Sequence, residues 1–192
     1  MVPLHPKPPA LARFVADLEA LLATSPGESE ILAHGQKLLA SLIATDDWLP
    51  PSVAACRHDR YQQYLLHLDP AARFSIVSFV WGPGQSTPVH NHTVWGLVGV
   101  LRGAEEVQAF TRQPDGTLVP AGPPATMTPG MVDSVSPASG DIHSVRNALA
   151  HAPSISIHVY GGNIGAIRRS VFLPDGSEKE FISGYSEPVT PQ

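Results

Sequence analysis

Residues 84–103 read GQSTPVHNHTVWGLVGVLRG. Two histidines, His90 and His92, stand one residue apart between a proline and an apolar run that ends in glycine. Because residues two apart in a β-strand point to the same face, both imidazoles can reach one metal ion. An isolated pair of this kind is weak evidence, since polar alternation on an exposed strand gives the same pattern. The rest of the chain therefore decides what the pair means.

Length and composition favour one globular domain that acts on a small molecule. The 192 residues leave room for a helical extension but not for a second catalytic domain. Hydrophobic residues make up 43% of the chain, yet no apolar run approaches the roughly 20 residues that a spanning helix needs. The proline-broken start MVPLHPKPPALARF does not resemble a signal peptide, so we expect a cytoplasmic protein.

Charge and cysteine content limit the possible partners and the possible metal ligands of the protein. The net charge is −5 with only 12 Lys and Arg, which argues against nucleic acid or an anionic membrane as the partner. The single cysteine, Cys56, excludes an internal disulfide and a cysteine-only zinc site. A metal must therefore be held by other ligands. Whether the chain forms a homo-oligomer is left open.

The periodicity predicts helices first and strands afterwards. Apolar residues recur at helical spacing over 9–22 and 31–43. After about residue 61 the helical periodicity gives way to short runs of strand-forming residues, separated by turns rich in Gly, Pro and Asp. The predicted strands are 61–68, 73–81, 94–101, 105–112, 131–136, 142–148, 154–160 and 167–173. We predict a mainly β fold, a jelly-roll barrel over 56–192 as the catalytic domain, with a helical segment over 1–55 packed on it.

A second motif, PASGDIHSVRN, covers residues 137–147 and contains His143. Gly84 and Gly103 flank the histidine pair, and Pro137, Gly140 and Asn147 surround the third histidine. Together these motifs resemble the two signatures of the cupin superfamily. The resemblance implies a double-stranded β-barrel in which His90, His92 and His143 can hold a metal.

One departure from the cupin pattern bears on the metal. The glutamate that cupins usually carry shortly after the histidine pair is replaced by VWGL at 94–97, so no carboxylate ligand is evident. Three neutral imidazoles leave a divalent ion its full charge and open positions, which should favour anionic ligands such as thiolates. Zinc with three histidines and water is also chemically reasonable and would give hydrolysis or hydration.

The stretch SISIHVY at 154–160 is a third motif of interest. Ser156, His158 and Tyr160 share one face of a strand, and three aliphatic residues share the other. On a strand with one solvated face the polar side would meet water. In a barrel built around a metal, the polar face of the strand can instead point inward. The serine would then orient the imidazole, and the imidazole would fix the tyrosine hydroxyl.

Taken together, HNHTVWGLVGVLRGAEE, GDIHSVRN and the Ser-His-Tyr strand resemble the thiol dioxygenase family of cupins, from about residue 60 to 185. This family comprises cysteine dioxygenase and 3-mercaptopropionate dioxygenase. The resemblance implies an Fe(II) ion held by His90, His92 and His143, with Ser156, His158 and Tyr160 beside it. It also implies that both atoms of O2 are added to a thiol sulfur, giving a sulfinic acid.

Two departures narrow the subfamily. Animal cysteine dioxygenases carry a cysteine just after the histidine pair, which crosslinks to the triad tyrosine, whereas this chain has VWGL there. They also read RYxR on one strand, and the second arginine holds the substrate carboxylate. Here RYQQ puts Gln63 in its place, as in the 3-mercaptopropionate enzymes. Tyr61 faces the same way, and a register slip would exchange Gln63 for Gln62.

The missing positive charge has two candidates, Arg168 and its equal rival Arg169, which period-two alternation places on opposite faces. We therefore expect an iron-dependent thiol dioxygenase that prefers 3-mercaptopropionate over L-cysteine. One alternative is a three-histidine cupin with another metal, acting in hydrolysis, isomerisation or diketone cleavage. Another is a non-catalytic cupin that binds a small acid.

Overall fold

The computed structural model describes residues 6–175 and 177–189. Two helices, α1 (Pro9–Ala23) and α2 (Glu28–Leu42), and a short 3-10 helix, η1 (Pro51–Val53), precede the strands. The strands are β1 (Gln62–Leu68), β2 (Ser75–Trp81), β3 (Val89–His90), β4 (Gly96–Arg102), β5 (Glu105–Arg112), β6 (Leu118–Pro120), β7 (Ala125–Met127), β8 (Val132–Val135), β9 (Ile142–Asn147), β10 (Ser154–Tyr160), β11 (Arg169–Phe172) and β12 (Glu178–Phe181). None of the helices described is long and apolar enough to cross a membrane.

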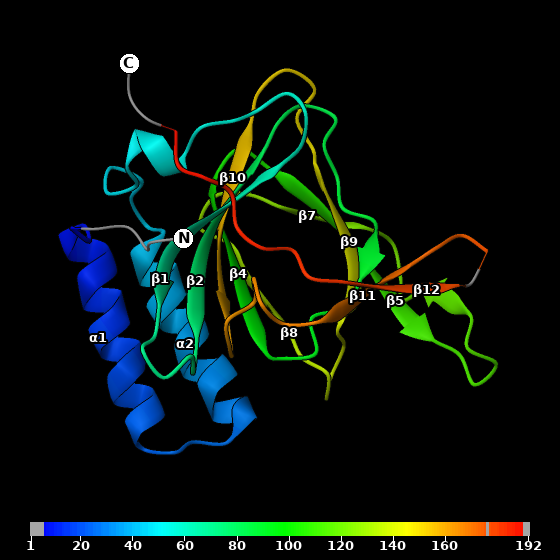
Figure 1. Ribbon diagram of the computed structural model, residues 1–192, viewed down its shortest axis with the longest axis horizontal. Coiled ribbons are helices and arrows are strands. Elements are labelled where there is room, and N and C mark those ends of the chain that lie inside the picture. Colours follow the sequence, from blue (N-terminus) through cyan, green and yellow to red (C-terminus); the bar gives the residue numbers. More distant parts are fainter. Residues whose placement is uncertain (1–5, 176, 190–192) are drawn as a thin grey trace.

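The strands form two antiparallel sheets that face each other (Figure 1). The first has the order β1-β2-β10-β4-β8, and the second has the order β12-β11-β3-β9-β5-β6, with β7 also paired to β5. Several neighbours in the sheets, such as β2 and β10 or β3 and β11, are far apart in sequence, as expected when a jelly roll alternates between its two sheets. The predicted mainly β barrel of jelly-roll type with an N-terminal helical cover is confirmed.

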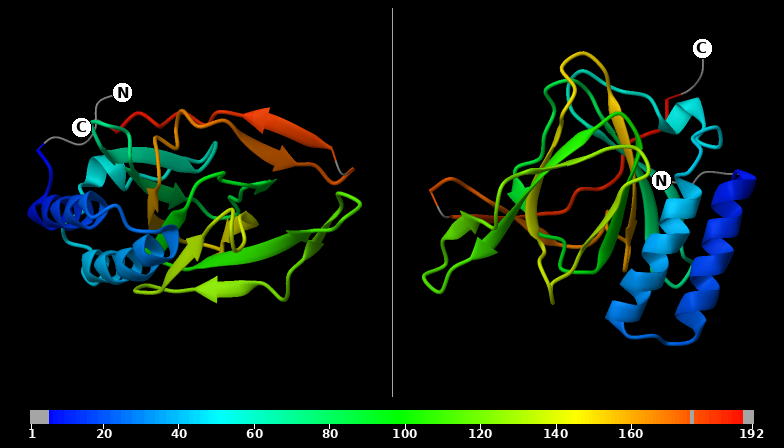
Figure 2. Two further views of the ribbon diagram at one scale, coloured as in Figure 1. Left: turned by 90° about the horizontal axis from the view of Figure 1, so that it is seen from below. Right: turned by 180° about the vertical axis from the view of Figure 1, so that it is seen from behind.

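The two helices cover the outer face of the five-stranded sheet, as the three views in Figures 1 and 2 agree. Pro9 occupies the first turn of α1, where its missing N–H costs no hydrogen bond. The helix α2 lies close to β4, since a Cβ on Gly99 would be 3.1 Å from Cγ of Leu39 on that helix. Glycine thus permits this helix to lie close to the sheet.

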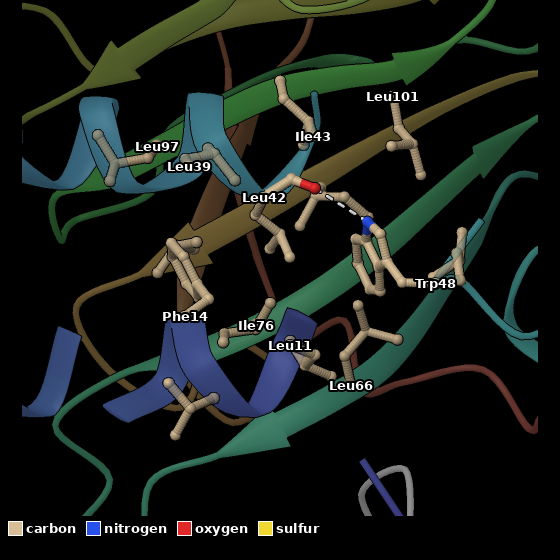
Figure 3. Close-up of a cluster of buried hydrophobic side chains, with 14 of the residues drawn as sticks. Leu11, Phe14, Leu39, Leu42, Ile43, Trp48, Leu66, Ile76, Leu97 and Leu101 are labelled. Atoms are coloured by element: carbon tan, nitrogen blue, oxygen red, sulfur yellow. Dashed lines mark hydrogen bonds between the residues drawn. The ribbon is translucent and has the colours of Figure 1, made fainter. Parts of the chain in front are cut away.

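The apolar side chains between helices and sheet form the larger core cluster (Figure 3). Leu11, Leu39, Ile76 and Leu97 are fully buried there. Burying each such side chain stabilises the fold by about 1.5–3 kcal/mol. The indole N–H of Trp48 donates to the carbonyl of Leu42 at 2.9 Å and so fixes the chain after α2.

Strands β2 and β10 are buried on both faces, which explains why alternation alone could not orient them. On the outer face the aliphatic residues of β10 pack in the cluster beneath the helices. On the inner face Phe79 and Trp81 of β2 join Tyr160 in a second cluster inside the barrel. Because helices cover the outer face, the polar face of β10 points into the barrel rather than to water.

The predicted strand at residues 131–136 appears as β8, and the strands β3, β6, β7 and β12 were not predicted. Each has only two to four residues, which is too short for a periodic pattern to be recognised. Only His90 of the histidine pair lies in β3, and the strand ends before His92. The two imidazoles therefore do not extend from one continuous strand.

Candidate metal centre

Three buried imidazoles converge inside the barrel. The ligand nitrogens of His90, His92 and His143 all lie within 4.8 Å of one another. His90 on β3 pairs directly with His143 on β9, so cross-strand register brings together two residues 53 positions apart in sequence. Within the described residues this is the group of potential ligands that could hold a metal, and no carboxylate belongs to it.

The protonation of these imidazoles suits metal binding. Nδ1 of His90 lies 3.0 Å from the carbonyl oxygen of Pro88. A carbonyl oxygen can only accept, so Nδ1 carries the proton and Nε2 keeps its lone pair. Burial lowers the pKa of His90 to about 3 and that of His143 well below its usual range. Neutral nitrogen donors of this kind fit a divalent transition metal.

Asp141 fixes the second ligand. Nδ1 of His92 donates to Oδ1 of Asp141 at 2.9 Å. The same carboxylate accepts the backbone N–H groups of His92 at 3.0 Å and Thr93 at 2.9 Å. It thereby holds the turn after β3, where the backbone of Thr93 has φ of 62°. The carboxylate sets both the tautomer and the direction of the His92 ring, as is common behind metal-ligating histidines.

The Ser-His-Tyr constellation forms a hydrogen-bonded chain. Oγ of Ser156 lies 2.8 Å from Nε2 of His158, and Nδ1 of His158 lies 2.8 Å from the hydroxyl of Tyr160. All three side chains are buried. Burial lowers the pKa of His158 well below its usual range and raises that of Tyr160, so the imidazole is neutral and the phenol keeps its proton.

The hydrogen-bonded Ser-His-Tyr triad lies beside the three histidines. The ring of Tyr160 stacks on that of His92 with centroids 5.5 Å apart. His158 stacks on Phe79 at 4.1 Å, and the indole N–H of Trp81 donates to Oγ of Ser156 at 3.3 Å. Aromatic packing thus holds the triad in place, with its tyrosine end nearest the candidate metal site.

Gly96, in the stretch that follows the histidine pair, lies opposite Tyr160. The two residues pair in register between β4 and β10. A Cβ on Gly96 would lie 2.9 Å from Cδ1 of the tyrosine ring. The glycine therefore gives the ring its space.

A cavity of about 250 Å³ opens beside the histidines. His90, His143, His158 and Tyr160 line it, and its walls are aromatic and aliphatic, including Phe79. This volume lies just below the roughly 300–1,000 Å³ of typical ligand pockets. The cavity therefore suits a small ligand.

The structure distinguishes the two candidate arginines. Arg168, the expected carboxylate partner, does not line the cavity; its side chain is 65% exposed and pairs with Glu180 at 2.9 Å. Arg169 lines the cavity and is only 4% exposed. This placement corrects the prediction, and its physical reason is alternation, since β11 begins at Arg169 and turns that residue inward.

The buried guanidinium of Arg169 is incompletely paired. Its Nη2 donates to Oγ of Ser183 at 2.7 Å, and its Cζ lies 4.6 Å from the ring centroid of Phe181. Its Nε has no hydrogen-bond partner, and no carboxylate in the described part of the chain forms a salt bridge with it. A buried cation without a counterion is costly, so the cavity favours an anion.

Of the two neighbouring glutamines, Gln63 lines the cavity together with Tyr61. Gln62 points elsewhere: it is buried, and its Nε2 donates to the carbonyl of Arg60 at 2.7 Å. The register of β1 therefore places Gln63 and Tyr61 on the inner face, as the alternation predicts.

Asp141 lies in the GDIHSVRN motif, but no role was predicted for it. Its only signal was its position two residues before His143. Lying in a different segment from His92, it could be matched to that ring only after the fold brought β3 and β9 together.

No protein-family model matches the chain. Among solved structures, a DMSP lyase from Ruegeria pomeroyi is similar at 15% identity and a TM-score of 0.48, over 88% of this chain and 99% of that one. A Klebsiella pneumoniae protein with a double-stranded β-helix domain is similar at 16% and 0.47, over 62% and 93%. A cupin superfamily protein from Desulfitobacterium hafniense is similar at 16% and 0.43, over 62% and 95%.

By its own strand order and side chains, the chain is a double-stranded β-barrel with three buried histidines that are compatible with a bound metal ion.

Proposed function

We propose that this protein is an iron(II)-dependent thiol dioxygenase that converts a small thiol carboxylate to its sulfinic acid, with 3-mercaptopropionate preferred over L-cysteine. The observation that carries the proposal is a buried arginine without a carboxylate partner, Arg169, in the same small cavity as the histidine cluster. A ligand there meets a nitrogen donor set at one side and an unpaired guanidinium at another.

The histidine cluster supports the metal part of the proposal. His90, His92 and His143 would hold the ion through neutral nitrogens, without a carboxylate to offset its charge. An ion of undiminished charge attracts a thiolate strongly. Bound Fe(II) would supply open coordination positions and a redox centre for the reaction of thiolate with O2.

The cavity lining supports a thiol carboxylate as the substrate. Arg169 would bind the carboxylate through charge-assisted hydrogen bonds, and Gln63 would add a neutral contact. The described lining residues include no Asp or Glu, so the ammonium group of cysteine would have no counterion. A thiol carboxylate that lacks an amine therefore fits better.

The overall change is balanced without a further reductant. The thiol R–SH and O2 give R–SO2H, in which the sulfur loses four electrons and dioxygen gains four. The S–H and O–O bonds break, two S–O bonds form, and the thiol proton is released or retained on the sulfinate. Arg169 and Gln63 would orient the substrate, which lowers the entropic cost of the reaction. Tyr160, whose pKa burial raises, would remain a hydrogen-bond donor toward bound ligand.

Oxygen uptake by the iron-loaded protein tests the proposal with three matched thiols. 3-Mercaptopropionate carries the carboxylate alone, cysteine carries both carboxylate and amine, and cysteamine carries the amine alone. We expect kcat/KM to fall in that order, with one sulfinate formed per O2 consumed. A much higher kcat/KM for cysteine would overturn the substrate assignment.

Metal analysis of the purified protein completes the test. Full occupancy by zinc or nickel without thiol-dependent oxygen uptake would overturn the dioxygenase and favour a cupin with other metal chemistry. Ligand binding without turnover at full iron occupancy would instead favour a small-acid binder.

A further inference from the structure

The segment that follows β12, residues 182–189, crosses from the seven-stranded sheet to the five-stranded one, and we call it the strap (Figure 1). The backbone N–H of Ser186 donates to the carbonyl of Gln63 on β1 at 2.8 Å, and the N–H of Gln63 donates to Oγ of Ser186 at 2.9 Å. Further along, the N–H of Val189 donates to the carbonyl of Ser52 at 2.9 Å. The strap is therefore fixed beyond the cavity, which its residue Ser183 lines.

The middle of the strap is held by the loop between β10 and β11. The hydroxyl of Tyr185 accepts from the N–H of Gly165 at 3.0 Å and donates to Oδ1 of Asn163 at 2.7 Å. The N–H of Gly184 donates to the carbonyl of Gly165 at 3.0 Å. A Cβ on Gly165 would collide with the ring of Tyr185, so glycine lets the loop lie directly against the strap. These contacts give Ser183 a defined position at the cavity.

The hydroxyl of Ser183 has a proton that the protein does not use. Its Oγ accepts a hydrogen bond from Nη2 of Arg169 at 2.7 Å, and within the described residues this is the hydrogen bond that the side chain makes. A serine hydroxyl has one proton to donate in addition to its acceptor sites. Because Ser183 and Arg169 both line the cavity, that proton can be donated to a ligand beside the guanidinium.

The charges around Ser183 favour an anionic acceptor. Lys179 on β12 also lines the cavity, whereas its neighbours Glu178 and Glu180 pair with arginines outside it. The described lining residues include no Asp or Glu that could accept the serine proton or neutralise Arg169. A ligand at this wall therefore meets cations and a hydroxyl donor, which are the groups that bind a carboxylate.

We propose that Ser183 is a ligand-binding residue that forms one carboxylate site together with Arg169. The serine oxygen accepts from Nη2 and so orients the guanidinium, while the serine proton and the remaining guanidinium N–H groups are donated to the same carboxylate. The identity of the ligand as a thiol carboxylate rests on the proposed function. The site itself requires only a small carboxylate.

Propionate is the probe that tests this site, because it carries the carboxylate of 3-mercaptopropionate without the thiol. The full chain is loaded with Zn²⁺, a diamagnetic ion, and nitrogen NMR follows the Nε–H group of Arg169, which has no hydrogen-bond partner in the protein. Its signal is the one missing from Arg169→Lys. We expect propionate to shift this signal in a saturable way, and neutral propionamide, of the same shape, to leave it in place.

Two serine variants make the test specific. Ser183→Ala removes one hydrogen bond to a charged ligand, so we expect the Kd for propionate to rise about tenfold. Ser177→Ala is the matched control in the turn between β11 and β12, where the hydroxyl donates to Asp175 at 2.6 Å. The control should bind propionate with unchanged Kd.

The same Kd for propionate in Ser183→Ala and in the unmodified protein would overturn the proposal. So would an Arg169 signal that propionate does not move, because the carboxylate would then bind elsewhere, for example on the zinc ion. The measurement uses neither thiol, O2 nor iron, so its failure is separate from failure of the proposed oxygenase activity.

Discussion

The carboxylate of Asp141 accepts a hydrogen bond of 2.9 Å from Nδ1 of His92, a residue 49 positions earlier in the chain. This contact joins the turn after β3 to the start of β9, and it orients the imidazole that belongs to neither strand. The candidate metal site is therefore held by a residue that is not itself one of the three ligands.

Replacing this carboxylate should weaken metal binding without unfolding the barrel. Asp141→Asn keeps an acceptor for Nδ1–H but loses the charge, so we expect metal affinity to fall about 10–100-fold. Competition with a chelator measures the change. Asp133→Asn, at an exposed position on β8, is the control and should bind metal normally. Equal affinities for the two variants would contradict the role of Asp141.

The two adjacent arginines offer a matched pair for the substrate site. Arg169→Ala removes a buried guanidinium from the cavity, whereas Arg168→Ala removes an exposed one paired with Glu180. A charge-assisted hydrogen bond contributes about 1.5–3 kcal/mol, so we expect KM for 3-mercaptopropionate to rise roughly 10–100-fold in Arg169→Ala. Arg168→Ala should show little change. Steady-state oxygen uptake decides, and a larger effect of Arg168→Ala would refute this assignment.

Loss of the tyrosine hydroxyl should affect turnover but not metal content. Tyr160→Phe removes one neutral hydrogen-bond donor, and we expect kcat/KM to fall by up to about tenfold. Tyr64→Phe is the control: that tyrosine is also buried, and its hydroxyl donates to the carbonyl of Ala55 at 2.8 Å, but it does not line the cavity. The control should lose stability and retain kcat. Reduced iron content in Tyr160→Phe would point to a structural role instead.

Two glycines of β4 lie against different parts of the structure, Gly96 against the candidate site and Gly99 against the core beneath the helices. A Cβ on Gly96 would displace the ring of Tyr160, and a Cβ on Gly99 would meet Ile43 on the helix side at 2.8 Å. Both substitutions to alanine should destabilise the fold by about 1–3 kcal/mol, because both overpack it. Only Gly96→Ala should also lower kcat. Thermal unfolding together with oxygen uptake distinguishes them, and a normal kcat in Gly96→Ala would show that the ring tolerates the shift.

Glu105, the first residue of β5, is fully buried and should make the free energy of unfolding depend on pH. Glu105 has a pKa of about 7 in the folded protein against an ordinary 4.5, so the folded state retains the proton longer than the unfolded state. Its contribution is therefore most favourable below pH 4.5, falls as the pH rises to about 7, and is constant above that. The total loss is on the order of 3 kcal/mol.

Urea unfolding at several pH values, compared between the unmodified protein and Glu105→Gln, isolates this contribution. The variant should lack the decline between pH 4.5 and 7, while Glu106→Gln should keep it. A parallel pH dependence in all three proteins would mean that other groups are responsible.

Much of the fold was predictable because its elements are periodic. The helices over 9–22 and 31–43 match α1 and α2 closely, since their apolar positions recur every three to four residues. The long strands were also found, whereas β3 and β12 were too short to give a pattern. The orientation of β10 remained open until the helices were seen to cover its aliphatic face.

Residue identity and spacing were enough to predict the donor types: three histidines without a nearby glutamate or cysteine, and a Ser-His-Tyr alternation on one strand. Their chemistry follows from residue identity and local spacing, which a linear pattern records. The fold was needed to see that Arg169 rather than Arg168 enters the cavity, that Asp141 holds His92, and that Glu105 is buried against Ser154. These relationships depend on strand register and on contacts between distant segments, and neither is fixed by periodicity along the chain.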